Sequence, residues 1–327
     1  MTPVHTPVLL AECLKELSPL GEPYEKNAFM IDSTLGEGGH TEAFLRMYQG
    51  LKICGVDADQ AIQARAKERL SAFGGRALFY NGWFNDFYSD YPQDLPKPNL
   101  ILFDLGISIF HYELSGRGFS FRSDEPLDMR IDPSKGKSAA DIVNQTAERE
   151  LADLIYLYGE EKLSRRIARS IVQARESSRI LTSAALAGVI ENAVGGRYAG
   201  QKIHPATRTF QALRIAVNDE LGHLPRALLD AFNVLASGGK MGVITFHSLE
   251  DRIVKNFFRN LSKQCVCPPN APSCVCGGRP CAELLTRKPL GPSEREVKEN
   301  SPSRSAKLRV ARKITDAGES RLLGLEA

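Results

Sequence analysis

An aspartate, Asp32, and the glycine-rich loop that follows it are the residues of this sequence that most directly indicate chemistry. They follow an apolar run at 28–31 and precede a helix-compatible run. Glycine allows a tight turn and a close approach of the backbone to a ligand, and the start of a helix offers unpaired N–H groups. A second apolar run, 53–56, ends in Asp57, which is placed to accept hydrogen bonds from ribose hydroxyls. Residues 28–57 therefore predict a strand–helix–strand unit that binds an adenosine-containing cofactor.

The spacing of the glycines indicates which cofactor this unit binds. They stand at positions 36, 38 and 39, whereas the third glycine of the dinucleotide pattern G-x-G-x-x-G would stand at position 41, which is Thr41. Asp32 would oppose a pyrophosphate, but it suits the amino group and sulfonium of S-adenosylmethionine. The loop therefore favours S-adenosylmethionine over a nicotinamide dinucleotide. A glycine turn with two surface aspartates is the alternative without a cofactor.

The composition is that of a globular protein with no strong excess of either charge. Of 327 residues, 43% are hydrophobic and 25% are charged, and 42 Lys and Arg against 39 Asp and Glu give a net charge of +3. An RNA-binding role must therefore rest on local clusters of basic residues. No apolar run approaches the ~18 residues that a membrane span needs, and no signal peptide is visible, so we expect a cytoplasmic protein with no membrane contact. Seven cysteines without a secretion signal argue against a disulfide framework.

Apolar runs predict six strands, which helix-compatible stretches such as 59–73 separate in the first part of the chain. The runs are at 28–31, 53–56, 77–80, 100–104, 240–246 and 306–310. This alternation predicts an α/β fold with a parallel sheet, in which ligands bind at the carboxyl ends of the strands. The loops after the first four strands should therefore meet at one place.

A helical, strand-poor region interrupts this pattern. Apolar residues recur every three or four positions, as in amphipathic helices, in three segments: 147–158, 160–176 and 183–194. We therefore predict three parts of the chain: an α/β core at 1–112 and 216–315, a helical insertion at 113–215, and a frayed tail at 316–327.

Seven short segments resemble a single protein family when they are read together. In chain order they are 5–10 (HTPVLL), 32–40 (DSTLGEGGH), 104–108 (DLGIS), 117–121 (RGFSF), 126–130 (PLDMR), 204–211 (HPATRTFQ) and 246–252 (FHSLEDR). The chain resembles the bacterial 16S ribosomal RNA cytosine-N4 methyltransferases, also called the RsmH or MraW family, over about residues 5–312. The resemblance implies a Rossmann-like class I S-adenosylmethionine methyltransferase fold with an inserted helical domain. It also implies methylation of the N4 amine of a decoding-centre cytidine in the 16S rRNA of the small ribosomal subunit.

The cofactor positions of that family can be carried over onto this sequence. They are Gly38, Gly39, His40, Asp57, Phe84, Asp104 and His111. Phe84 matches an aromatic residue near the adenine, and Asp104 matches the acid that closes the fourth strand. His111 is a departure, because relatives usually have a glutamine there that contacts the cofactor. A histidine can also donate or accept a hydrogen bond, although its positive form would oppose a sulfonium.

Methyl transfer to a cytosine amine benefits from a hydrogen-bond acceptor on that amine. The nitrogen lone pair is delocalised into the ring, and an acceptor favours the geometry that frees it and stabilises the developing positive charge. We expect Asp104 or a backbone carbonyl near Gly106 to be this acceptor, with Ser108 as a further candidate. Cofactor binding alone is the alternative role of Asp104. The cytosine must also leave any base stack to reach the methyl group.

Arginines in or beside the insertion are candidates for contacts with RNA. Four of them lie in or near the family-like segments: Arg117, Arg130, Arg208 and Arg214. Arginine suits phosphate contacts, so we expect the insertion to recognise the RNA substrate. Pairing with nearby acids such as Asp128 is the structural alternative.

Two Cys-x-Cys pairs form a second candidate site in a segment rich in proline and glycine. The four residues are Cys265, Cys267, Cys274 and Cys276. Four thiolates in a short loop can bind zinc tetrahedrally, but Cys-x-Cys pairs match structural zinc sites less well than Cys-x-x-Cys pairs. A surface loop with reduced thiols, or a loop that becomes ordered on the ribosome, is the alternative.

Two other functions compete with the methyltransferase prediction. An NAD-linked oxidoreductase is disfavoured by Thr41 and Asp32. A non-catalytic RNA-binding or ribosome-assembly factor with a vestigial pocket is disfavoured by the glycine loop, Asp57 and Asp104. We therefore predict S-adenosylmethionine as the cofactor and the 16S rRNA within the small ribosomal subunit as the partner. The sequence makes no prediction of the oligomeric state.

Overall fold

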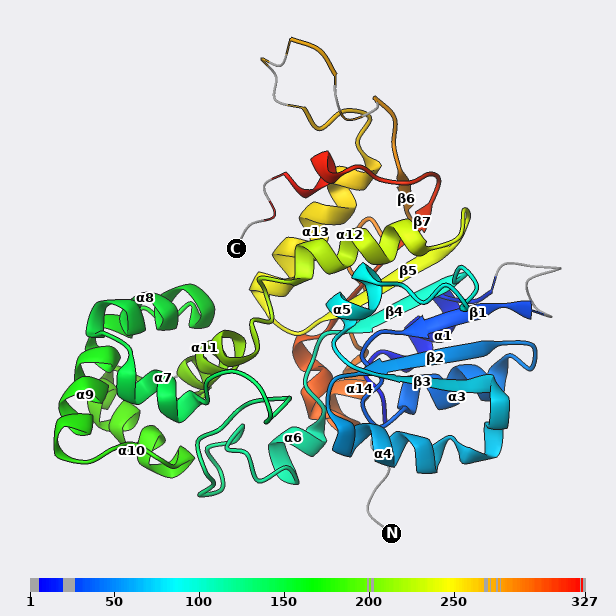
Figure 1. Ribbon diagram of the computed structural model, residues 1–327. Coiled ribbons are helices and arrows are strands. Elements are labelled where there is room, and N and C mark those ends of the chain that lie inside the picture. Colours follow the sequence, from blue (N-terminus) through cyan, green and yellow to red (C-terminus); the bar gives the residue numbers. More distant parts are fainter. Residues whose placement is uncertain are drawn as a thin grey trace. The chain divides into compact units, whose positions relative to one another are not determined.

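The chain forms two compact units in the computed structural model, which describes residues 6–19, 27–198, 200, 203–267, 270, 272–274, 276, 278–323 and 325. Met1–Ile107 and Leu221–Ala327 make up one unit, and Ser108–Glu220 make up the other. We call them the sheet unit and the helical unit (Figure 1). His5, the first residue of the first family-like segment, lies outside the described residues. Among the helices of the described ranges, none is long and apolar enough to cross a membrane.

The sheet unit is built on a seven-stranded sheet with the order β3-β2-β1-β4-β5-β7-β6. Its strands are β1 (Phe29–Asp32), β2 (Lys52–Asp57), β3 (Ala77–Asn81), β4 (Leu100–Asp104), β5 (Lys240–Thr245), β6 (Ala282–Leu284) and β7 (Lys307–Lys313). The strands from β3 to β5 are parallel, and β7 runs antiparallel to both β5 and β6. The predicted α/β class is confirmed. Strand β6 was not predicted, because three residues are too few to show a hydrophobic pattern.

Helices lie on both sides of this sheet (Figure 1). They are α1 (Leu10–Glu16), α3 (Gly39–Met47), α4 (Gln60–Arg69), α5 (Phe84–Ser89), α12 (Leu224–Val234), α13 (Ser248–Ser262) and α14 (Glu294–Glu299). Every residue of β1 and β5 is buried. Strands that are covered on both faces are apolar throughout, which is why they stand out in the sequence as continuous apolar runs.

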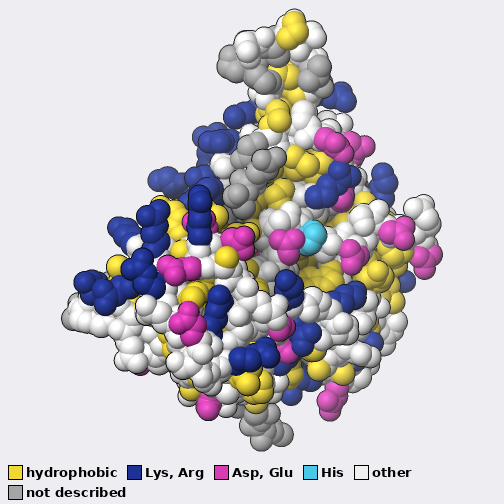
Figure 2. Space-filling model, turned by 60° about the vertical axis from the view of Figure 1, so that its left-hand side comes forward, with side chains coloured by type: hydrophobic (Ala, Val, Ile, Leu, Met, Phe, Trp, Pro, Cys, Tyr) yellow, Lys and Arg dark blue, Asp and Glu magenta, His cyan; other side chains and the backbone are white. Residues whose placement is uncertain are grey.

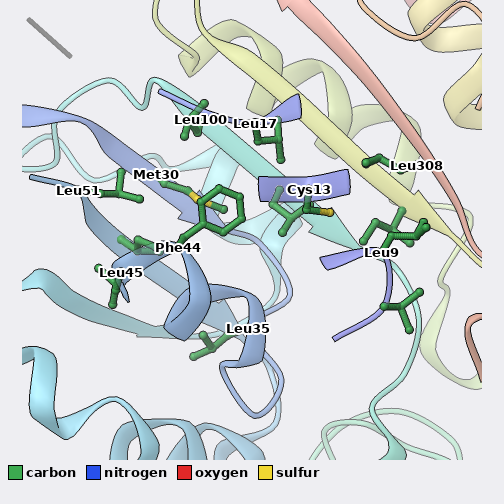
Figure 3. Close-up of a cluster of buried hydrophobic side chains, with 14 of the residues drawn as sticks. Leu9, Cys13, Leu17, Met30, Leu35, Phe44, Leu45, Leu51, Leu100 and Leu308 are labelled. Carbon is green, nitrogen blue, oxygen red and sulfur yellow. The ribbon is translucent and has the colours of Figure 1, made fainter. Parts of the chain in front are cut away.

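The N-terminal helix belongs to the core of the sheet unit. Leu9, Cys13 and Leu17 follow one another at intervals of four residues, so they lie on one side of the helix. All three are fully buried and share an apolar cluster with Met30 of β1 (Figure 3). Gly242 of β5 permits this packing, because a Cβ there would lie 2.8 Å from Leu17 Cδ1.

The helical unit contains α6 (Ile109–Glu113), α7 (Ala139–Gln145), α8 (Glu148–Gly159), α9 (Ser164–Ser177), α10 (Ser183–Val194) and α11 (Thr207–Asn218). Helix α8 packs against α9 and α11, and α9 also packs against α10. The predicted helices at 147–158 and 183–194 are confirmed. Helix α9 begins later than the predicted residue 160, because Glu160 has a left-handed conformation (φ 48°) and the Glu161 carboxylate accepts a hydrogen bond from Leu163 N (2.7 Å).

A buried arginine holds the C-terminal segment on the sheet unit. Arg321 lies in a short 3₁₀ helix, Glu319–Leu322, and donates to the carbonyls of Asn260 (2.6 Å), Lys263 (2.8 Å) and Arg279 (2.6 Å). This short helix and its contacts lie within the segment from residue 316 that was expected to be frayed. A buried guanidinium needs partners for its donors, and these three carbonyls fix the segment that carries it.

Candidate active site

Three aspartates end three neighbouring strands of the sheet. Asp32 ends β1, Asp57 ends β2 and Asp104 ends β4. Strand β1 pairs in parallel with β2 on one side and with β4 on the other, so these carboxyl ends lie at one edge. Thr34, in the loop after β1, accepts a hydrogen bond from Asp104 N at 2.7 Å and ties the loop to the end of β4.

Asp32 is buried and receives one strong hydrogen bond. Thr41 Oγ1, in the first turn of α3, donates to Asp32 Oδ2 at 2.7 Å. Burial raises the pKa of Asp32 to about 6, and the hydrogen bonds from Thr41 and Thr34 limit the rise. Thr41 stands where the dinucleotide pattern has a glycine, and its hydroxyl group holds the Asp32 carboxylate, which a glycine could not do.

Asp57 fixes the glycine loop against the end of β2. Gly36 N donates to Asp57 Oδ2 at 2.8 Å, and Asp59 N donates to Oδ1 at 2.9 Å. A carboxylate offers about four acceptor positions, so each oxygen can still accept a ribose hydroxyl. Asn81 Nδ2 also donates to the Asp57 carbonyl at 3.1 Å, which joins β3 to the same edge.

Two glycines of the loop are required by packing within the chain. Gly38 has a φ of 77°, and a Cβ there would lie 3.0 Å from Leu70 Cδ1. A Cβ on Gly39 would lie 2.5 Å from Pro7 Cγ. The close approach that Gly39 permits is therefore to Pro7, in the segment before α1, and it holds that segment on the loop.

Asp104 lies next to a buried histidine. His40 Nδ1 is 3.7 Å from Asp104 Oδ2, and His40 Nε2 is 3.0 Å from the carbonyl of Val8. When Nε2 donates to that carbonyl, Nδ1 of a neutral ring presents a lone pair to the carboxyl group. Burial, followed by the charge of Asp32, raises the pKa of Asp104 to about 8.

Two carboxyl oxygens at this edge have no hydrogen-bond partner among the described residues. They are Asp32 Oδ1 and Asp104 Oδ1, and both are buried. Buried acceptors are nearly always satisfied in proteins, so an unpartnered pair at the end of the central strands indicates a ligand that brings donors or positive charge.

Glu250 and Phe246 support the turn that follows Asp104. Glu250 is buried at the start of α13 and accepts a hydrogen bond from Phe246 N at 2.9 Å. The Phe246 ring packs over Gly106, where a Cβ would lie 2.5 Å from Phe246 Cε2. Only glycine fits at this position. The bond between Glu250 and the backbone of Phe246 was not predicted, although Glu250 stands three residues after His247, as in a capping box.

The remaining predicted cofactor and catalytic residues divide between the units. Phe84 begins α5 in the sheet unit, is half-buried, and contacts Phe103 edge-on with ring centroids 5.5 Å apart. Ser108 and His111 belong to the helical unit. Ser108 caps α6, since its Oγ accepts a hydrogen bond from Phe110 N at 3.2 Å. His111 is buried.

Comparison with known proteins identifies the family. Residues 2–314 match the MraW methylase family. The chain belongs to this family. It is 59% identical over 314 residues to "Ribosomal RNA small subunit methyltransferase H" of Treponema denticola, which covers 96% of this chain and 98% of the relative. It is 47% identical over 322 residues to a protein of the same name from Dehalococcoides mccartyi, which covers 97% of this chain and 88% of the relative.

This member of the MraW methylase family has the predicted fold. Its sheet order, with the antiparallel β7 between β5 and β6, is that of class I S-adenosylmethionine-dependent methyltransferases. The Rossmann-like fold predicted from the sequence is therefore confirmed.

Three of the four arginines proposed for RNA contact have close partners within the helical unit. Arg117 Nη1 donates to the carbonyls of Arg130 (2.9 Å) and Ile131 (2.8 Å). Arg130 forms a bidentate pair with Asp128 at 2.7 and 2.8 Å, as the structural alternative predicted. Arg214 forms another bidentate pair with Glu220, at 2.8 Å for both bonds.

Arg208 is the fourth of these arginines and is the least constrained. Its Nη1 lies 3.7 Å from Glu161 Oε2, and its side chain is 36% exposed. A weakly paired, partly exposed guanidinium can still turn toward a phosphate.

Helix α9 has a basic face that was not predicted from the sequence. The face of the protein in Figure 2 is mixed in charge, with acids between the Lys and Arg side chains. Binding to RNA would therefore depend on local clusters of basic residues. Arg165, Arg166 and Arg169 are exposed residues of α9, and their spacing i, i+1 and i+4 places Arg165 and Arg169 on one side of the helix. The exposed Lys162 lies just before the helix, and Arg166 also donates to the carbonyl of Ala193. Lys162 and Arg165 have no acidic partner in the described part of the chain, and Arg169 lies 3.5 Å from Glu148. The spacing alone could have revealed this face.

The four cysteines predicted as a metal site are close in space. Their sulfur atoms all lie within 4.8 Å of one another, between α13 and β6.

Proposed function

We propose that this protein transfers the methyl group of S-adenosylmethionine to the N4 amine of a cytidine in the 16S rRNA of the small ribosomal subunit. The observation that carries the proposal is 59% identity, over nearly the whole chain, to a relative named as a small-subunit ribosomal RNA methyltransferase. The choice of cytosine, of its N4 amine and of the decoding centre rests on the family resemblance of the sequence motifs.

The acidic edge of the sheet fits the cofactor. Asp32 Oδ1 and Asp104 Oδ1 are buried acceptors without partners among the described residues, which suits a cationic group. Asp57 would accept the ribose hydroxyls, and the half-buried Phe84 would cover one side of the adenine. When bound, S-adenosylmethionine supplies a methyl carbon that is activated by the neighbouring positive sulfur.

Asp104 is the proposed acceptor for the target amine. A carboxylate that accepts a hydrogen bond from the amine holds it in the geometry that frees the nitrogen lone pair. It also stabilises the positive charge that develops on this nitrogen, and the effect is stronger in a partly buried site than in water. His40 positions the carboxyl group, since its ring is fixed by the Val8 carbonyl at 3.0 Å and faces Asp104 at 3.7 Å.

The helical unit is the proposed RNA-binding part. The exposed basic residues of α9 (Arg165, Arg166 and Arg169), with Lys162 just before the helix, offer cations to phosphate groups, and Arg208 adds another. Phosphate contacts position an RNA without reading its sequence, and the base then has to leave its stack to be methylated. Arg117, Arg130 and Arg214 would chiefly shape this unit through their internal bonds.

Transfer of labelled methyl from S-adenosylmethionine to small subunits that lack the modification tests the proposal. We expect transfer by the wild type and a loss of roughly 100-fold or more in Asp104→Asn, the scale expected for removing one preorganised electrostatic group. Asp94→Asn is the control, because Asp94 is an exposed carboxylate in the loop before β4. Cofactor binding without transfer to subunits or to free 16S rRNA would favour an assembly factor, and nicotinamide binding would favour an oxidoreductase.

A further inference from the structure

The cysteine loop between α13 and β6 has the geometry of a tetrahedral metal site. Cys265 Sγ is 3.8 Å from Cys274 Sγ and 3.5 Å from Cys276 Sγ, and Cys274 Sγ is 3.5 Å from Cys276 Sγ. Disulfide sulfurs are only about 2.05 Å apart. Four sulfurs at about 2.3 Å from one zinc ion are about 3.8 Å from one another. The three observed distances are therefore close to those between ligands of one ion, and Cys267 Sγ lies within 4.8 Å of the other three sulfurs.

We propose that Cys265, Cys267, Cys274 and Cys276 bind one structural Zn²⁺ ion. None of these four cysteines is in a disulfide, and each offers one sulfur to a common centre. A closed set of four thiolates selects a borderline-soft metal with tetrahedral preference and excludes Mg²⁺ and Ca²⁺, which take oxygen ligands. A set with no open position is structural rather than catalytic.

The backbone around the sulfurs supports the site. Val266 N donates to Cys276 Sγ at 3.4 Å, as backbone N–H groups do in the outer shell of thiolate sites. Gly278 has a φ of 60°, and a Cβ there would lie only 3.7 Å from Cys274 Sγ, so the chain turns closely around the cluster. The loop from Lys263 to Arg279 contains no acid, and its two charged residues are both basic, which suits a Zn(Cys)₄ centre with net charge −2.

The base of the loop is already closed by protein contacts. The Arg321 guanidinium donates to the carbonyls of both Lys263 and Arg279, at 2.8 and 2.6 Å, and Cys281 N donates to the Leu261 carbonyl at 2.7 Å. The described residues between these two ends form no helix or strand, and Cys265 and Cys274 are exposed. The described part of this exposed loop has few buried apolar side chains to hold its shape, and a metal ion would cross-link the loop through the four cysteines.

Metal analysis of the full-length protein tests the proposal. Protein that is reduced, stripped with a chelator, reloaded with Zn²⁺ and desalted should retain about one Zn²⁺ per chain. Cys265→Ser/Cys274→Ser should retain none, whereas the control Cys281→Ala should retain the full amount, because buried Cys281 lies outside the cluster. Co²⁺ in place of Zn²⁺ should give the visible absorption of tetrahedral thiolate ligation in the wild type and the control only.

Hydrogen exchange gives a readout that is independent of metal content. Amides of the loop should exchange about tenfold more slowly with Zn²⁺ than without it, and the double serine variant should not respond. Retention of less than about a tenth of an ion per chain with all thiols reduced would overturn the proposal. Retention of iron in preference to zinc, or a zinc content unchanged in the double variant, would also overturn it.

Discussion

Asp32 is buried and Asp104 is partly buried, and Oδ1 of each is a buried atom without a hydrogen-bond partner in the described structure. Burial raises the pKa of Asp32 to about 6 and that of Asp104 to about 8. After burial, the charge of Asp32 raises the pKa of Asp104 further, and the charge of Asp57 raises that of Asp32, so both carboxyls resist ionisation in the absence of a cation. Such strain is expected where a site is shaped for a ligand rather than for stability.

Replacing Asp104 by asparagine should stabilise the ligand-free protein at high pH. The folded-state pKa of about 8 exceeds the unfolded value of about 4, so the folded form holds a proton that the unfolded form has lost. Wild-type stability therefore falls as the pH rises from about 4 to about 8. We expect Asp104→Asn to be nearly neutral at pH 4 and to raise the free energy of unfolding by several kcal/mol above pH 8, on the order of 1.4 kcal/mol for each unit of pKa difference.

Denaturant unfolding across this pH range measures the effect, with Asp94→Asn as the control that leaves the pH dependence unchanged. An equal gain in the free energy of unfolding at pH 4 and pH 8.5 would contradict this account, because the gain would then be independent of the protonation of Asp104.

At the residue scale, positions could be predicted from the sequence but partners could not. Asp32 and Asp57 stand out because each ends an apolar run. The bond from Thr41 to Asp32 and the contact of His40 with Val8 depend on how α3 and the N-terminal segment pack. Arg117 donates to backbone carbonyl groups, which every residue type has, so its partners within the helical unit could not be predicted from the sequence.

The glycine loop shows how elements position the site. Gly39→Ala would place a Cβ 2.5 Å from Pro7 Cγ and push the N-terminal segment away from α3. We expect a loss of about 1–3 kcal/mol in the free energy of unfolding, typical of overpacking, together with weaker S-adenosylmethionine binding. Gly75→Ala is the matched control, since nothing lies within 4 Å of a Cβ there. Equal effects of the two substitutions would show that packing on Pro7 is unimportant.

The basic face of α9 should contribute to RNA affinity through charge. Arg165→Ala/Arg169→Ala removes two exposed guanidinium groups and should weaken binding to 16S rRNA roughly tenfold. The slope of log K against log salt should become less steep by about 1 to 2, because binding releases about one counterion fewer for each phosphate contact that is lost. Filter binding at several salt concentrations measures both quantities.

A double substitution on the sheet unit controls for net charge. Lys15→Ala/Lys298→Ala removes the same charge from exposed residues of α1 and α14. If it lowers the affinity and the salt slope as much as the α9 variant does, the α9 face has no specific part in RNA binding.

Elements with long apolar patterns were predictable, and short or polar ones were not. The apolar runs and the amphipathic spacing gave the strands from β1 to β5, β7, and the helices α8 and α10. Strand β6 owes its place to pairing with β7, which no local pattern encodes. The start of α9 depends on the left-handed Glu160 and on the Glu161 cap, which are backbone features of one turn.

At the scale of the whole molecule, the chain interrupts a class I methyltransferase sheet between β4 and β5 with a helical unit. The change in composition located this unit, although the structure divides at Ser108 and Glu220 rather than at 113 and 215. Contacts between distant segments were beyond sequence reasoning. Arg321 links the C-terminal segment to both ends of the cysteine loop through carbonyl groups, which every residue type provides.

Identification of the methylated nucleotide tests the central claim most directly. Small subunits from cells that lack the modification would be incubated with the wild-type protein and S-adenosylmethionine, and the digested 16S rRNA would be analysed by tandem mass spectrometry. We predict a single added methyl group on the exocyclic N4 nitrogen of a cytidine in a decoding-centre fragment. A methyl group on cytosine C5, on a ribose hydroxyl or on RNA of the large subunit would contradict the account.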